Sequence, residues 1–249
     1  MFILKDILLP ISLIINFLFL LIIYFTVYKK EKLLNLLYKY RKTNRFSFLV
    51  SNYLIRYPFY DQRESLFKVL PTSINEIVFL GDSLTNGCEW SELFQNPNLK
   101  NRGIESDNSL GVHKRIGTVI KSKPSKIFIM IGVNDLGSNT PIEIIIENFN
   151  KIIQQIKDDS PSTKVYIQSI LPTNSKLYKG AATNRKIREL NVNLENLARN
   201  FGLDYIDIFS FLIDSDGGLD QRYSNDGLHL LAEGYLVWKN VIEKYISKT

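Results

Sequence analysis

Four short polar motifs contain side chains that together could cleave an ester. In chain order they are Gly81-Asp82-Ser83-Leu84, Asn101-Arg102-Gly103-Ile104, Gly132-Val133-Asn134-Asp135 and Asp226-Gly227-Leu228-His229. A serine hydroxyl becomes a useful nucleophile when a base lies within hydrogen-bond reach, and a histidine such as His229 is a common base in this role. A carboxylate beside the imidazole fixes its tautomer and stabilises its charged form. Asp226, three residues before His229, has the spacing for this role.

Acyl transfer also needs hydrogen-bond donors for the oxyanion of the tetrahedral intermediate. The candidates are the Ser83 N–H at a predicted helix start, the Gly103 N–H, which a substrate can approach closely, and the Asn134 side-chain amide. Asp82 and Asp135 are expected to support the turns that carry Ser83 and Asn134. Each residue alone has an ordinary explanation as a cap, a turn residue or a strand end. Their order along the chain favours one catalytic site.

The elements that position these motifs follow from the hydrophobic pattern. Short apolar runs predict strands, and apolar residues at helical spacing predict the helices between them. The predicted strands are 77–80, 99–104, 126–131, 164–170 and 203–208, and the predicted helices are 108–120, 141–157, 183–200 and 232–246. This alternation is typical of a parallel sheet with helices on both faces, so we expect a three-layer α/β/α domain. Ligands of such sheets bind beyond the carboxyl ends of the strands, where the first three motifs lie.

The four motifs in this order resemble the blocks of the GDSL, or SGNH, esterases. The resemblance covers about residues 72–246. It implies a flavodoxin-like fold with five parallel strands, a catalytic triad and an oxyanion hole. The triad would be Ser83, His229 and Asp226, and the oxyanion hole would be formed by Ser83, Gly103 and Asn134. The pairing of "NRGI" with "GVND" is most similar to the branch of platelet-activating-factor acetylhydrolase and bacterial carbohydrate O-acetylesterases.

One departure from that branch follows the second motif. Where the branch has a Gly-Asp pair, this chain has Ser106-Asp107, and Glu105 replaces a small residue. Glu105 could alter the choice of substrate or disfavour anionic substrates. The departure removes no catalytic group that the resemblance implies.

The resemblance implies a serine hydrolase that acts on a carboxylic ester without a metal or an organic cofactor. We expect a short acyl group, such as acetyl, on a carbohydrate or a related small molecule. Two alternatives stay open: a lysophospholipase or thioesterase acting on longer acyl chains, and a non-catalytic binding module on the same fold. The two histidines and the single cysteine form no cluster with metal-ligand spacing. The sequence does not indicate an oligomeric state.

The N-terminal segment predicts a membrane anchor. The 22 residues from Ile7 to Tyr28 carry no charge, and as a helix they would be about 33 Å long, which matches a hydrocarbon core of about 30 Å. We therefore expect a transmembrane anchor in 1–30 that contacts lipids, a basic, aromatic connector in 31–71 and an esterase domain in 72–249.

The excess of positive charge lies close to the predicted anchor. The formal net charge is +6, and seven Lys or Arg residues fall between Lys29 and Arg45. This clustering beside the anchor suggests lipid headgroups or a solvated linker, and we expect no nucleic-acid partner. By the positive-inside rule it places the catalytic domain on the cytoplasmic side.

Overall fold

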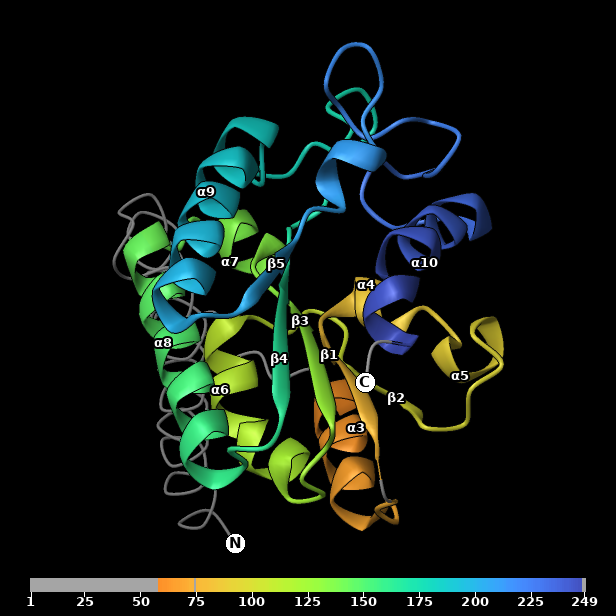
Figure 1. Ribbon diagram of the computed structural model, residues 1–249. Helices are drawn as coiled ribbons and strands as arrows, with labels where there is room; N and C mark the ends of the chain where they lie inside the picture. Colours follow the sequence, from red (N-terminus) through yellow and green to blue (C-terminus); the bar gives the residue numbers. More distant parts are fainter. Residues whose placement is uncertain (1–57, 74, 248–249) are drawn as a thin grey trace, which may run out of the picture. The chain divides into compact units, whose positions relative to one another are not determined.

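The sheet of the domain is parallel and has five strands. The computed structural model of the protein describes residues 58–73 and 75–247, and Figure 1 shows their arrangement. The strand order is β2-β1-β3-β4-β5. The strands are β1 (Ile77–Gly81), β2 (Leu99–Gly103), β3 (Lys126–Met130), β4 (Lys164–Gln168) and β5 (Asp204–Ile206). All residues of β1 and β3 are buried, as expected for central strands that are covered on both faces. The predicted parallel sheet is confirmed.

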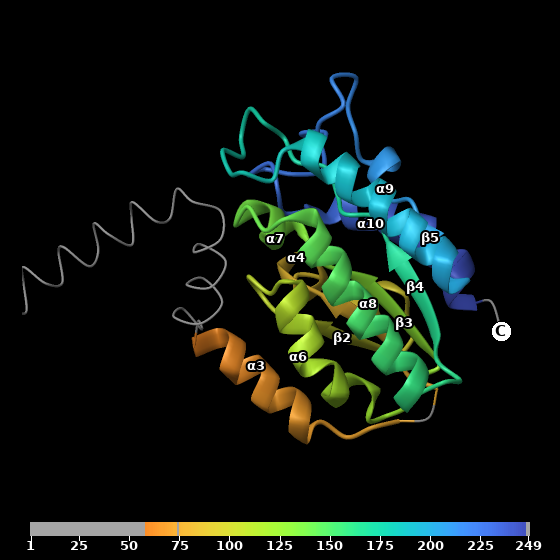
Figure 2. The same cartoon turned by 90° about the vertical axis from the view of Figure 1, so that its left-hand side faces the viewer.

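Helices cover both faces of this sheet. The helices are α3 (Pro58–Val69), α4 (Ser83–Asn86), α5 (Trp90–Leu93), α6 (Ser109–Ile120), α7 (Val133–Gly137), α8 (Ile142–Asp159), α9 (Asn184–Phe201), η1 (Phe209–Phe211) and α10 (Ala232–Ser247). In the two views of Figures 1 and 2, α6, α8 and α9 lie over one face and α10 lies over the other. The four long predicted helices match α6, α8, α9 and α10 to within two residues at each end.

The sequence of α8 shows why the long helices form and where they pack. Its apolar residues Ile145, Phe149, Ile152 and Ile156 recur at intervals of three and four, and all four are fully buried. Burying each of these side chains contributes about 1.5–3 kcal/mol relative to exposure. Helix α9 has the same spacing and ends at Gly202, whose φ of 66° is the left-handed conformation of a C-terminal cap.

A row of aromatic rings joins the sheet to α10. Phe79, Phe128 and Tyr166 are partners in the parallel register of β1, β3 and β4, and their rings stack with centroid distances of 5.2 and 4.6 Å. Trp90 stacks on Phe79 at 4.0 Å and meets Trp238 of α10 edge to face at 4.9 Å. This packing holds α10, and with it the preceding loop, against the end of β1.

Helix α3 lies within the predicted connector 31–71, so the connector contains part of the folded domain. Figure 2 shows α3 beside α6, where Phe67 is buried and the Tyr60 hydroxyl donates to Gly111 O at 3.4 Å. The prediction missed this helix because its apolar face is narrow and Phe67 is its only buried residue.

The predicted membrane segment, 7–28, lies outside the described residues. Among the helices that the structure does describe, none has both the length and the apolar character needed to cross a bilayer.

Candidate active site

Ser83 lies at the turn between β1 and α4. Asp82 is the N-cap of α4, and its Oδ1 accepts the Leu84 N–H at 3.0 Å. Gly81 ends the strand where a Cβ would collide with Met130 O and the Thr85 hydroxyl, so no side chain fits there. The turn is therefore held by buried contacts on both sides of the serine, whose own side chain is only partly buried.

His229 and Asp226 lie in the loop that precedes α10, and the structure brings both to Ser83. The Ser83 Oγ is 3.0 Å from His229 Nε2, and His229 Nδ1 is 2.6 Å from Asp226 Oδ2. The other carboxylate oxygen, Oδ1, accepts the N–H groups of Leu228 and His229, each at 2.8 Å. The three side chains therefore form one continuous hydrogen-bonded chain, in the order that the sequence predicts.

The contacts of Asp226 keep its carboxylate ionised. Partial burial raises the pKa of Asp226, but the hydrogen bond to His229 and those from the backbone N–H groups of Leu228 and His229 outweigh it, and the pKa falls to about 2. The carboxylate is thus negative at neutral pH. A negative charge beside Nδ1 favours a proton on that nitrogen and leaves Nε2 free to accept one from Ser83.

The two other predicted oxyanion donors, Asn134 and Gly103, have different hydrogen-bond partners in the structure. Asn134 lies in α7 after β3, and its Nδ2 donates to Asp107 O at 2.9 Å, which fixes the amide at the end of the sheet. The Gly103 N–H donates to the Asn101 side-chain oxygen at 2.8 Å. The amide of Asn101 also donates to three carbonyl groups around α4. The geometry therefore does not support Gly103 as a donor, because its N–H already has a partner.

The role of Gly103 is to let β2 approach α4. A Cβ at this position would meet the backbone of Asn86 and would lie 2.8 Å from Asp82 O. In the turn that follows, the N–H groups of Glu105 and Ser106 donate to no group among the described residues, and Ser106 has a φ of 60°. Its neighbour Asp107 accepts the Asn134 amide, so the turn that carries Ser106 is joined to the predicted donor. The left-handed φ explains why the related branch has a glycine there.

A buried polar network lies beneath these turns, and the sequence predicted only part of it. Asp135 accepts the Ser109 N–H and hydroxyl at 2.9 and 2.7 Å, and Asn148 of α8 donates to the same hydroxyl at 2.9 Å. Asp107 and Arg115 form an ion pair at 2.8 Å, with both side chains 1% exposed. Neither Ser109, Asn148 nor Arg115 was predicted, because each lies on a helix without a motif. Within the described residues, no three His, Cys, Asp or Glu side chains are placed to hold a metal ion.

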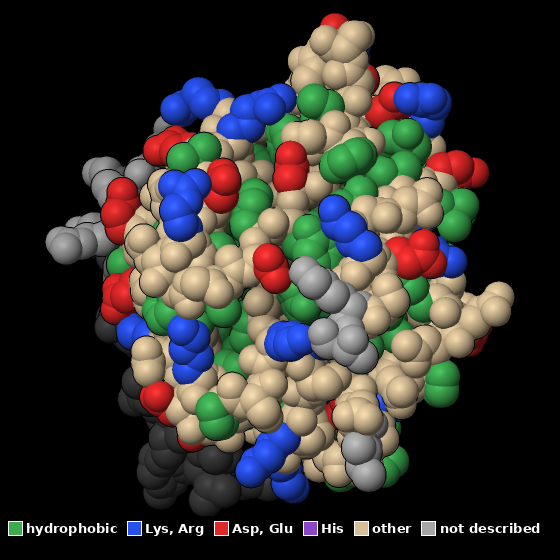
Figure 3. Space-filling view, in the orientation of Figure 1, with side chains coloured by type: hydrophobic (Ala, Val, Ile, Leu, Met, Phe, Trp, Pro, Cys, Tyr) green, Lys and Arg blue, Asp and Glu red, His purple; other side chains and the backbone are tan. Residues whose placement is uncertain are grey.

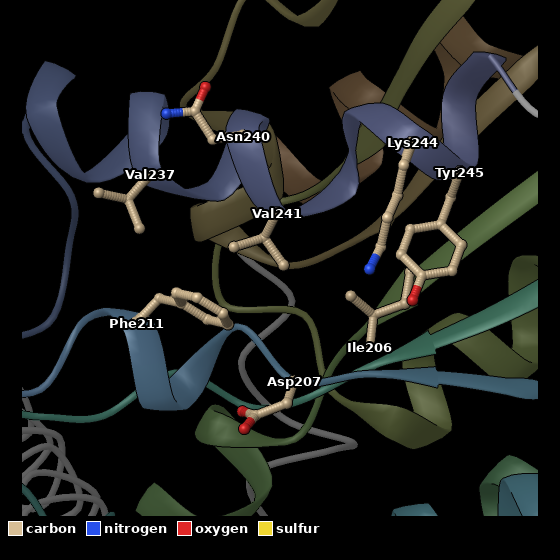
Figure 4. A pocket seen from close by; sticks show the side chains of 8 residues that line it. All are labelled: Ile206, Asp207, Phe211, Val237, Asn240, Val241, Lys244 and Tyr245. Carbon is tan, nitrogen blue, oxygen red and sulfur yellow. The ribbon is translucent and has the colours of Figure 1, made fainter.

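A separate groove of about 620 Å³ lies between the end of β5, η1 and α10. Figure 4 shows Phe211 on one side and Val237, Asn240 and Val241 on the other, with Asp207 and Lys244 adding opposite charges. Figure 3 shows basic and acidic side chains interspersed over the face drawn there. None of the residues of the Ser83–His229–Asp226 chain lines this groove, so it is not the place of acyl transfer.

Known proteins with similar sequences and structures identify the family. The model of the GDSL-like Lipase/Acylhydrolase family matches residues 79–237. Over 181 residues the chain is 29% identical to an N-acylneuraminate cytidylyltransferase of Escherichia coli, a match that covers 70% of this chain and 41% of that enzyme. The chain thus spans about two fifths of the length of this relative.

Two solved structures share the fold. A protein from Streptococcus pneumonia, provisionally described as a platelet activating factor, superposes with a TM-score of 0.72 at 28% identity, and the match covers 80% of this chain and 96% of that one. A catalytic mutant of an acetylxylan esterase from Geobacillus stearothermophilus has a TM-score of 0.59 at 14% identity, with 72% and 97% covered, and shows the fold alone. With the family match over most of the domain, the predicted family is confirmed: the chain belongs to the GDSL-like lipases and acylhydrolases.

Proposed function

We propose that the protein is a serine ester hydrolase with Ser83, His229 and Asp226 as its catalytic triad, and that it removes a short acyl group, such as acetyl, from a carbohydrate or a related small molecule. The observation that carries the proposal is the hydrogen-bonded chain from Ser83 Oγ to His229 Nε2, at 3.0 Å, and from His229 Nδ1 to Asp226, at 2.6 Å. A nucleophile, a base and a carboxylate in contact are the arrangement that activates a serine.

In the proposed reaction, Ser83 Oγ attacks the ester carbonyl carbon while His229 Nε2 accepts the hydroxyl proton. Asp226 stabilises the imidazolium that forms. The tetrahedral intermediate then collapses, and His229 returns the proton to the leaving alcohol oxygen as the carbon–oxygen bond breaks. Water, deprotonated by the same imidazole, hydrolyses the acyl-enzyme and regenerates Ser83. No other reactant is needed, and the products are the acid and the alcohol.

The oxyanion of each tetrahedral intermediate would be bound by the N–H of Ser83, the Nδ2 of Asn134 and the N–H of Ser106. Ser106 replaces Gly103 in this role because the Gly103 N–H is already donated to Asn101. Asn134 would retain its hydrogen bond to Asp107 O through one amide hydrogen and use the other for the oxyanion, since a side-chain amide has two donors. Each such donor contributes about 3–4 kcal/mol of transition-state stabilisation in comparable sites.

The nature of the substrate is supported by the similar proteins. One relative is named as an N-acylneuraminate cytidylyltransferase, and a protein of the same fold is named as an acetylxylan esterase. Glu105, which is exposed in the turn beside Ser106, would add a negative charge near the bound substrate and disfavour anionic acyl groups. These points favour a small, uncharged acyl group on a sugar over a fatty acyl chain.

We further propose that residues 7–28 anchor the enzyme to a membrane, with the domain on the cytoplasmic side. The support is the uncharged run and the seven basic residues that follow it. A fusion of alkaline phosphatase after Thr249 should be inactive, because this reporter works only when exported, and a fluorescent protein fused at the same place should be bright. An active phosphatase fusion would reverse the proposed orientation, and a full chain recovered without membranes would refute the anchor.

Labelling with a fluorophosphonate and hydrolysis of p-nitrophenyl esters test the catalytic proposal. Ser83→Ala should lose all labelling and reduce kcat/KM by at least about 10³-fold, because the nucleophile is absent. Ser65→Ala, which removes an exposed hydroxyl from α3, is the matched control and should match the wild type. Labelling that persists in Ser83→Ala would overturn the assignment, and a wild type that neither labels nor hydrolyses esters would indicate a binding module.

An acyl-chain series tests the proposed substrate. Rates that fall from acetate through butyrate to octanoate would support a deacetylase. Rates that rise along this series would instead indicate a lysophospholipase or thioesterase with a longer acyl pocket.

A further inference from the structure

Asp82 carries a carboxyl group that the proposed reaction does not use as an acid or a base. The side chain is fully buried, and its Oδ1 accepts the Leu84 N–H. The other oxygen, Oδ2, is buried without a hydrogen-bond partner in the described part of the chain. An ionised carboxylate that is removed from water needs several donors to compensate its charge. Apart from its own backbone N–H, Asp82 has one donor, the Leu84 N–H, and it is therefore poorly placed to remain ionised.

Two other buried carboxyl groups near Asp82 are better compensated. Asp107 pairs with Arg115 at 2.8 Å, and Asp135 accepts two hydrogen bonds from Ser109. The Nη2 of Arg115 donates to Gly81 O at 3.1 Å, and its Nη1 donates to no described group. Arg115 therefore gives Asp82 no hydrogen bond. Of the three carboxyl groups, Asp82 therefore has the weakest compensation.

The charges around Asp82 also favour its protonated form. Burial is the main cause that raises the pKa of Asp82 to about 7; the Leu84 N–H opposes the rise, and the nearby carboxylates of Asp107 and Asp135 add to it. Burial likewise raises the pKa of Asp135, to about 6. From α10, Tyr235 faces the same region, and its pKa is raised by burial and by Cys88 and Asp82, so its phenol stays neutral.

A charge on Asp82 would also oppose the reaction. If Ser83 is the nucleophile, as proposed above, the oxyanion forms beside the Ser83 N–H, one residue from Asp82. A buried negative charge there would repel the oxyanion in a medium of low dielectric constant. We propose that Asp82 works as a neutral carboxylic acid, a positioning residue that caps the Ser83 turn through Oδ1 and carries a proton on Oδ2. The alternative is an ionised helix cap, which the positive end of a helix would favour.

If Asp82 is neutral, both kcat/KM and the free energy of unfolding should depend on pH. Above the pKa of Asp82, its ionisation should lower kcat/KM by up to tenfold for each pH unit, which gives an alkaline decline with an apparent midpoint at or above about 7. The free energy of unfolding depends on the protonation of the same carboxyl group. Because the folded pKa exceeds the unfolded value of about 4, the folded state holds the proton more tightly, and the free energy of unfolding falls as pH rises from about 4 to about 7.

Infrared difference spectroscopy between about pH 5.5 and about pH 9 tests the proton directly on the full-length protein. The wild type should show protonated carboxyl intensity that disappears at high pH, and Asp82→Asn should lose the part that Asp82 contributes while keeping the part from Asp135. Asp207→Asn, which changes an exposed carboxyl group, should retain all of this intensity. A wild-type spectrum with no such intensity attributable to Asp82 would overturn the proposal. This readout does not depend on ester hydrolysis, so it stands even if the proposed function fails.

The pH profile of kcat/KM for p-nitrophenyl acetate is the second test. Asp82→Asn and Asp82→Ser both keep a neutral acceptor for the Leu84 N–H, and either variant should lose the alkaline decline whatever its maximal rate. At about pH 9 the kcat/KM of the wild type should be about 10- to 100-fold below its maximum. Whichever of the two variants folds better should keep a kcat/KM close to its own maximum at that pH. An unchanged alkaline decline in the variants would contradict a neutral Asp82 and favour an ionised cap.

Discussion

Asp226→Asn tests the triad with little change of shape. In the wild type, Asp226 Oδ2 lies 2.6 Å from His229 Nδ1, and Oδ1 accepts two backbone N–H groups at 2.8 Å. An asparagine would keep its carbonyl oxygen on the two N–H groups, so its NH₂ would face Nδ1. Because an NH₂ only donates, Nδ1 would become the acceptor and the ring proton would move to Nε2. There it faces Ser83, and the ring can no longer accept the serine proton.

The expected loss of kcat/KM depends on how exposed the side chains of Asp226 and His229 are. Reversal of the tautomer in a buried triad costs about 10⁴-fold. The side chains of Asp226 and His229 are 48% and 47% exposed, so water can solvate the ring and weaken this constraint. We therefore expect kcat/KM to fall by about 10²- to 10³-fold, which corresponds to about 3–4 kcal/mol. Asp226→Ala leaves either tautomer accessible and should lose less, about 10- to 10²-fold.

The assay compares kcat/KM for p-nitrophenyl acetate among the wild type, Asp226→Asn and Asp226→Ala. Asp216→Asn, which removes an exposed carboxylate paired with Lys176, is the control and should behave as the wild type. Circular dichroism would verify that the variants are folded. The ranking is the decisive result: an asparagine variant as active as the alanine variant, or more active, would refute the reasoning about the tautomer and limit Asp226 to an effect of charge.

Substitutions at an ion pair and at two glycines test the supports beneath the site. Arg115→Met should lower the free energy of unfolding by about 3–5 kcal/mol, because it leaves the buried Asp107 unpaired, and a second change, Asp107→Asn, should recover most of this loss. Urea titration measures both, and a double variant as unstable as the single one would contradict the ion-pair explanation. Gly103→Ala should cost at least about 2 kcal/mol, because its Cβ would meet the Asn86 backbone. Gly117→Ala, in the interior of α6 with no atom closer than 3.8 Å, should instead stabilise by about 0.5–1 kcal/mol, and equal effects at the two glycines would be inconsistent with this packing.

The sheet and its long helices could be predicted because their patterns are local. The run that forms β3 is apolar throughout, and the residues of α8 repeat at helical spacing, so burial alone determines both elements. The order of motifs at the strand ends was equally informative, since parallel strands bring their carboxyl ends to one edge. That Ser83 meets His229, 146 residues further along, followed instead from the resemblance to the family, because His229 lies in the loop before α10 and not at a strand end.

The details that depend on side-chain direction could not be predicted. Whether the Gly103 N–H is free depends on the Asn101 side chain, which folds back to accept it. The left-handed backbone of Ser106 is typical of glycine, so a serine at this position gave no signal of its conformation. Arg115 of α6 reaches back to Asp107, eight residues earlier and before the start of the helix, and a lone arginine on a helix is usually a solvated side chain.

The two halves of the site, Ser83 and the loop with His229 and Asp226, are supported in different ways. Substitutions in the two halves should therefore affect stability and activity differently. Ser83 is held by Gly81 and by the buried Asp82, so changes around it disturb the core. His229 and Asp226 belong to a loop that is half exposed, attached to the core through the aromatic packing of α10. Substitutions in the loop should therefore reduce activity with little loss of stability, whereas those beneath Ser83 should reduce both. Because the loop is joined to the nucleophile by the 3.0 Å contact of one imidazole, that contact is where the geometry of the triad is most sensitive to a shift of α10.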